Sequence, residues 1–114
     1  MQYLVQMKLV APGRPTTPEE GAAFIEQYIF PTLELCKKPR DQKKIVAGGP
    51  MSGAVAIALI MNADSARELD DLITSLPIWP RMETEVIPLT TFEERAEIIR
   101  PILERSNAQT RGAA

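Results

Sequence analysis

A proline-rich stretch, Leu76 to Leu89, restricts the fold of this chain more than any other segment. Pro77 and Pro80 fix their own φ angles and disfavour helical geometry in the residues before them, so a preceding helix must end here. Residues 82–89 then have the composition of a strand. Trp79, the only tryptophan, stands between the two prolines, where it is either buried as a plug or lines a cleft. The stretch therefore predicts a stiff corner that joins a helix to a strand.

The composition is that of a soluble globular protein of one domain. The chain has 114 residues, of which 45% are hydrophobic and 25% charged, with 13 basic and 15 acidic residues. It contains no strong basic stripe, so nucleic acid is not an expected partner, and no apolar span that predicts membrane insertion. A local basic run over residues 37–44 is either a solvated helix end or an anion site.

The chain has one cysteine, Cys36, and no histidine. An internal disulfide is thereby excluded, and Ser-His and Cys-His catalysis are excluded as well. The usual ligands of zinc and most transition metals are missing, so we expect no metal and no cofactor. No secretory signal pattern opens the chain, and we expect a cytoplasmic protein.

The first half of the chain predicts a strand followed by an unusual helix. Residues 2–10 alternate between an apolar and a mixed face. Thr17 and Pro18 then form a good helix start, and the helical pattern continues to about Lys38. This helix is apolar around more than half of its circumference, and Pro31 within it predicts a kink.

Two further strands are expected at 43–47 and 54–61. The glycine-rich residues between them, 48–53, are interpreted as a wide hairpin loop. Alternatively, these glycines let the backbone approach a ligand, with Met51 as an apolar lip.

The second half predicts a helix, a strand and a last helix. An amphipathic helix ends near Ser75, and the strand at 82–89 follows the proline corner. Thr91 and Glu94 form a capping box that begins a helix over 91–106. Residues 1–106 are thus expected to form a single domain, and residues 107–114 a disordered tail.

The order of these elements is strand, helix, strand, strand, helix, strand and an extra helix. This order predicts an α+β protein of the ferredoxin-like type, with a four-stranded antiparallel sheet in which the first and third strands are central. Helices cover one face of such a sheet. The other face, which carries Gln6, Lys8 and a row of alanines, is expected to meet the sheet of another subunit.

The opening residues Tyr3 to Met7 and the corner Leu76 to Leu89 resemble the muconolactone isomerase-like branch of the dimeric α+β barrel proteins. In that branch Leu-Pro, an aromatic residue, a second Pro and a Met leading into Glu-Val recur at the same place. The resemblance implies homodimers or larger homo-oligomers, with small apolar or carbonyl-containing ligands held between helices and sheet. It also implies cofactor-free proton transfer on an unsaturated lactone. The suspected proton carrier of the family is a glutamate whose matching place here is near Phe24, and Glu26 is the nearest acid.

Several residues are candidates for such a site. The candidate catalytic residues are Glu85 and Glu26 as proton carriers and Tyr28 as a group that polarises a carbonyl. For each glutamate the alternative is a solvated surface charge. The candidate substrate-binding residues are Trp79, Arg81, Phe24, Met51 and Tyr3, where Arg81 either pairs with a ligand carboxylate or stacks on the indole.

Three hypotheses follow from this sequence. The first is a cofactor-free isomerase or cyclase acting on a small unsaturated carbonyl compound, with a cofactor-free monooxygenase as a variant. The second is a binding module that uses the same cavity without proton transfer. The third is a structural oligomeric protein. Fold alone does not choose among them.

Overall fold

Four antiparallel strands form one sheet in the computed structural model, which describes residues 1–10 and 13–113 of the chain. The strand order is β2-β3-β1-β4, so the first and third strands are central, as the sequence predicts. The register pairs Val5 with Leu59 on one side and with Val86 on the other. The strands are β1 (Gln2–Leu9), β2 (Ile45–Pro50), β3 (Ala56–Asn62) and β4 (Met82–Leu89).

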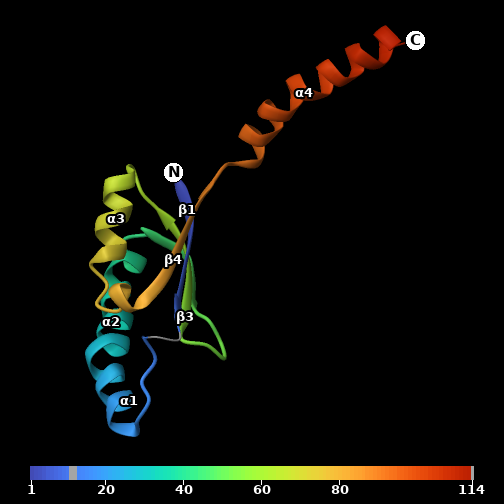
Figure 1. Ribbon diagram of the computed structural model, residues 1–114. Coiled ribbons are helices and arrows are strands. Elements are labelled where there is room, and N and C mark those ends of the chain that lie inside the picture. Colours follow the sequence, from blue (N-terminus) through green and yellow to red (C-terminus); the bar gives the residue numbers. More distant parts are fainter. Residues whose placement is uncertain (11–12, 114) are drawn as a thin grey trace.

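The helices α1, α2 and α3 cover one face of this sheet (Figure 1). Their apolar sides meet the alternate residues of β1 and β3, and Val5 and Met7 at the centre are fully buried. This arrangement confirms the predicted ferredoxin-like fold. The helices of the described chain are α1 (Pro18–Phe24), α2 (Phe30–Asp41), α3 (Ala66–Thr74) and α4 (Phe92–Ala113), with a π-helical turn at Ile25–Ile29 and a 3-10 turn at Trp79–Arg81.

A widened π-helical turn, rather than a sharp kink, separates α1 from α2. The N–H of Phe30 donates to the carbonyl of Ile25, five residues earlier. Pro31 follows immediately, and its ring has no N–H and would crowd the carbonyl one turn before it in a regular helix. The wider turn gives that carbonyl room. The extra residue also shifts the buried side of the helix, so Phe24 and Thr32 are buried while Ile25 and Leu33 are exposed.

Three helices begin with the same hydrogen-bonded cap. At each start a hydroxyl accepts a hydrogen bond from the backbone N–H three residues later; these hydroxyls belong to Thr17, Ser65 and Thr91. The residue three positions later is a glutamate in every case, and its side chain reaches back toward the start of the helix. The predicted starts at Thr17 and Thr91 are confirmed.

The hairpin between β2 and β3 differs from its expected boundaries. The predicted strands 43–47 and 54–61 are displaced to Ile45–Pro50 and Ala56–Asn62, so Gly48, Gly49 and Pro50 belong to a strand. The bulge between Ile45 and Ala47 and the left-handed φ of 102° at Gly48 accommodate these residues. The loop itself is shorter than predicted, since it contains only residues 51–55.

The last helix is longer than predicted and leaves the body of the molecule. α4 continues to Ala113, so residues 107–113, which were expected as part of a disordered tail, are helical, and residue 114 lies outside the described residues. Figure 1 shows α4 pointing away from the sheet, beyond the N-terminus. The molecule is accordingly elongated, with extents of 72 × 31 × 23 Å. None of the described helices is long and apolar enough to cross a membrane.

The face of the sheet opposite the helices carries no layer from the described chain. We call it the open face, and it consists of the side chains of β1, β3 and β4 that alternate with the core residues. Leu4, Ile60 and Ile87 occupy one end, and Lys8 lies opposite Glu83 near the other.

Candidate functional site

The proline corner is fixed to α2 by one buried hydrogen bond. The N–H of Ile78 donates to the hydroxyl of Thr32 over 3.2 Å, and the side chains of Leu76 and Ile78 are buried. Trp79, by contrast, is 38% exposed. The corner is therefore held by the residues around the indole, and Trp79 is not a buried plug.

Arg81, at the end of this corner, contacts Tyr28 of the π-helical turn. Its Nη2 donates to Tyr28 Oη over 3.2 Å, and its guanidinium carbon lies 5.0 Å from the centre of the phenol ring. The ring of Phe24 lies 5.3 Å from that of Tyr28, centre to centre. The fold thus brings together three of the predicted site residues, Phe24, Tyr28 and Arg81.

These three residues line a cavity of about 270 Å³, which we call the polar cavity. Arg14 and Gln27 also line it, as does the carboxylate-bearing residue Glu20. Because Tyr28 Oη accepts from Arg81, its own proton remains available for a ligand oxygen. The cavity thus combines two guanidinium groups, a phenol, an amide and a carboxylate.

Glu20 is held in place by the residues before α1. The N–H and the hydroxyl of Thr16 both donate to Glu20 Oε2 over 2.8 Å. These hydrogen bonds, the backbone one first, lower the pKa of the Glu20 carboxyl below its ordinary value. The carboxylate is thus ionised at neutral pH and can act as a base. Glu20 was expected only as an acid in the first turn of a helix.

An apolar cavity of about 160 Å³ lies on the other side of the π-helical turn. Ile29, next to Tyr28, lines it together with Ile78 and Met82 of the corner. Val55 and Ala56 close it from the hairpin. The π-helical turn and the proline corner therefore contribute to both cavities, one polar and one apolar.

The remaining predicted site residues lie elsewhere. Glu26 is exposed on the π-helical turn and does not line the polar cavity. Glu85 lies on the open face, beside Gln6 and Lys8. Met51 is 37% exposed in the hairpin, and Tyr3 is buried toward the far end of β1, where its hydroxyl donates to Met1 Sδ.

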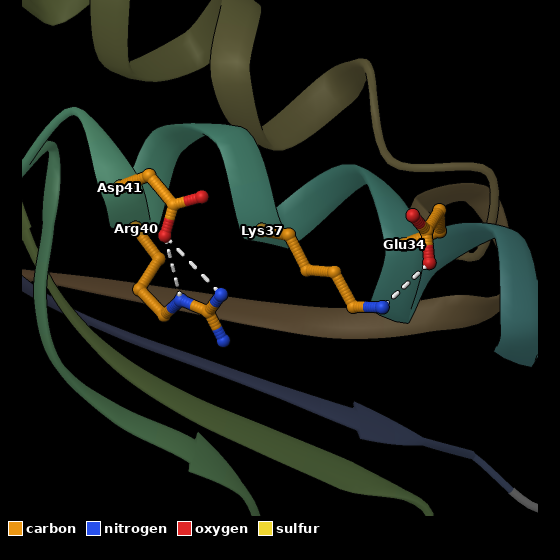
Figure 2. Close-up of polar contacts among 4 residues, drawn as sticks. All are labelled: Glu34, Lys37, Arg40 and Asp41. Atoms are coloured by element: carbon orange, nitrogen blue, oxygen red, sulfur yellow. Dashed lines mark hydrogen bonds and ion pairs between the residues drawn. The ribbon is translucent and has the colours of Figure 1, made fainter.

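A third concavity, of about 380 Å³, runs between α2 and the edge strand β2. Two residues of the basic run, Lys37 and Arg40, line it, but each is paired on its own helix. Lys37 Nζ lies 2.8 Å from Glu34, and Arg40 Nη2 lies 3.2 Å from Asp41 (Figure 2). Burial raises the pKa of the Cys36 thiol in the same groove. These pairs favour the solvated-helix interpretation of the basic run over an anion site.

No group of three or more Cys, Asp or Glu side chains that could hold a metal ion occurs in residues 1–10 and 13–113. The absence of a cofactor stays a prediction.

Comparison with solved structures gives the same fold. Muconolactone isomerase superimposes with a TM-score of 0.65 at 22% identity, covering 80% of this chain and 90% of the other. The 5-chloro-2-hydroxyhydroquinone dehydrochlorinase of Burkholderia phenoliruptrix, in complex with 2,5-dihydroxybenzoquinone, superimposes with a TM-score of 0.59 at 21% identity. That alignment covers 82% of this chain and 98% of the dehydrochlorinase.

A search of curated protein sequences gives no match. The sequence profile of the family Muconolactone delta-isomerase, however, matches residues 1–95, which include the whole sheet, both cavities and the start of α4. The chain therefore belongs to the muconolactone delta-isomerase family.

Proposed function

We propose that this protein is a cofactor-free isomerase or cyclase that moves a proton on a small unsaturated carbonyl or lactone compound. The observation that carries the proposal is the Arg81–Tyr28 pair in the polar cavity. Both groups can donate to one ligand oxygen, and such donors stabilise the negative charge that develops on a carbonyl oxygen when a neighbouring carbon loses a proton. Family membership supports the same class of reaction.

In this proposal Glu20 is the proton carrier. Its carboxylate takes a proton from the carbon next to the carbonyl, and the electrons of the broken C–H bond form an enolate held by Arg81 and Tyr28. The same proton then returns to the far carbon of the conjugated system, which moves the double bond and restores the carboxylate. Phe24 offers an apolar wall for the ring of the ligand.

Three glutamate variants test this assignment. Exchange of the acidic carbon-bound proton in deuterated water, followed by NMR with small lactones and enones, detects proton transfer whatever the final product. We expect Glu20→Gln to lower the exchange rate about 100- to 10,000-fold, since Gln keeps the capping interaction but cannot accept the proton. Glu26→Gln and Glu85→Gln serve as matched controls and should exchange at the wild-type rate.

Binding is measured separately through the fluorescence of Trp79, in the same 3-10 turn as Arg81. Arg81→Ala should abolish a saturable response that Glu20→Gln retains. A loss of exchange in Glu26→Gln or Glu85→Gln, with Glu20→Gln active, would reassign the proton carrier. Saturable binding without any exchange would support a binding module, and the absence of both would support a structural protein.

The rate of proton exchange should depend on pH in a defined direction. Because the pKa of Glu20 lies below its ordinary value, the carboxylate stays ionised as the pH falls through the usual glutamate range. The exchange rate should therefore persist through mildly acidic pH and fall only when the pH drops through the lowered pKa.

We also propose that the protein self-associates through the open face. Leu4 and Ile60 are only partly covered there, and Ile87 is 38% exposed. A second sheet stacked on this face would remove these side chains from water. Sedimentation of an Ile60→Asp variant should show dissociation, whereas an unchanged mass would argue against this surface.

A further inference from the structure

We propose that α4 is an intermolecular arm, whose apolar stripe packs against a second copy of this chain. The stripe consists of Phe92, Ala96, Ile98, Ile99, Ile102 and Leu103, which helical spacing places on one side of α4. It lies almost entirely beyond the part of the chain that the family profile matches. The arm is therefore a feature that family membership does not explain.

The body of the protein leaves this stripe uncovered. Every residue from 92 to 112 is exposed, and Phe92 reaches 93% exposure. The radius of gyration is 20.1 Å, whereas a compact chain of this length would have about 13 Å. The arm thus extends away from its own sheet, as Figure 1 also shows.

A helix of this kind needs a packing partner. Most of the stability of helices in proteins comes from burial of an apolar face, and isolated helices are marginal in water. At about 1.5 Å per residue, the 22 residues of α4 span roughly 33 Å. Its five large apolar side chains all lie within residues 92–103, about 18 Å of helix, which makes the stripe an interaction surface rather than scattered exposed residues.

The position of the arm identifies the partner as a second copy. Only residues 90 and 91 separate β4 from α4, so the arm begins at the edge of the open face. Ile87 belongs to that face and lies five residues before Phe92. The uncovered apolar side chains at the end of β4 and on α4 are therefore close in sequence, and one copy of the chain can cover both surfaces.

Charges on the two surfaces complement each other. Arg95 lies within the stripe of α4, whereas Glu97 and Glu104 point to the opposite side of the helix. The open face carries Glu83 and Glu85 on the strand that leads into the arm, with Lys8 opposite Glu83, so these three residues together have a net negative charge. An arm that packs along the second copy near this face would place Arg95 close to acidic side chains.

Sedimentation velocity over a dilution series tests the proposal with the full-length protein. We expect the double variant Ile99→Asp, Leu103→Asp to raise the apparent dissociation constant at least about 100-fold, since two large aliphatic side chains would lose their burial. The control is Glu97→Gln, Glu104→Gln, which changes the other side of the same helix and should leave the constant unchanged.

The fluorescence of Trp79 verifies that the body of each variant is folded. A change of less than about threefold in the stripe variant, or a wild-type protein that is monomeric throughout the series, would overturn the proposal. Binding of the monomer to vesicles of anionic phospholipid through the stripe would also overturn the proposal. Because the variants leave the polar cavity intact, a failed arm proposal and a failed isomerase proposal give different results.

Discussion

Two threonine hydroxyls in the body of the protein differ in their hydrogen bonding. Thr32 is 4% exposed, and its hydroxyl accepts the N–H of Ile78, which fixes the proline corner. The hydroxyl of Thr84, on β4, is buried and has no hydrogen-bond partner in the described part of the chain. The same isosteric change should therefore have different effects at the two positions.

We expect Thr32→Val to destabilise the protein by about 1–3 kcal/mol, because it leaves the N–H of Ile78 buried without an acceptor. Thr84→Val should be neutral or stabilise by up to about 1 kcal/mol, since it removes an unpaired polar group. Urea denaturation measures both. Thr32→Ser, which keeps the hydroxyl, should recover much of the loss, and equal effects of the two valine variants would contradict this account.

At the level of single residues, the sequence predicts part of the polar cavity. Phe24, Tyr28 and Arg81 were all candidates, and they meet as a group. Glu20 was missed because a glutamate three residues after Thr17 is the usual sign of a helix cap. The available signal was its spacing, since Glu20 lies one helical turn before Phe24 and therefore on the same side. The capping role and the cavity position coexist in one side chain.

Among the elements, the strand β2 shows why local residue preferences mislead. Gly48, Gly49 and Pro50 are typical of turns, yet they continue an edge strand. An edge position tolerates proline, whose missing N–H needs no partner on the outer side. Gly48 also has a left-handed φ of 102°, and a Cβ there would overlap the backbone carbonyl of Ala58 on β3. Only the paired strand reveals these constraints.

We predict that Gly48→Ala destabilises the fold by about 1–3 kcal/mol, through backbone strain and overlap with β3. Gly49→Ala is the matched control, because a Cβ at Gly49 meets nothing within 4 Å. The midpoints of urea unfolding measure the difference between the two. Comparable losses in both variants would show that the strand, rather than the position of Gly48, is sensitive to substitution.

The sequence pattern likewise did not predict the π-helical turn. Pro31 predicts an interruption, and the chain does depart from regular helix just before it. Whether a proline produces a kink or a widened turn depends on how the helix packs. Here the widened turn places Tyr28 and Ile29 on different cavities, which a regular 3.6-residue period does not anticipate.

For the whole molecule, the order of the elements was enough to predict the ferredoxin-like sheet and its central strands. The alternation of apolar residues in β1 and the prolines of the corner are local sequence signals. The structure contains the strand and the corner that they predict. The direction of α4 is different, because its residues 92–112 are all exposed rather than packed on the body. The helical pattern of residues 91–106 was visible, but the extension to Ala113 and the departure from the body were not.

The separation of α4 from the body has a spectroscopic consequence. The only indole, Trp79, belongs to the body, whereas residues 92–113 contribute much of the helical ellipticity. If the arm is stabilised only by a second copy, dilution should reduce the far-ultraviolet signal while the emission of Trp79 stays constant. The two optical signals would then change differently without any folding intermediate. The far-ultraviolet signal would follow the association equilibrium, whereas the emission of Trp79 would report on the stable core.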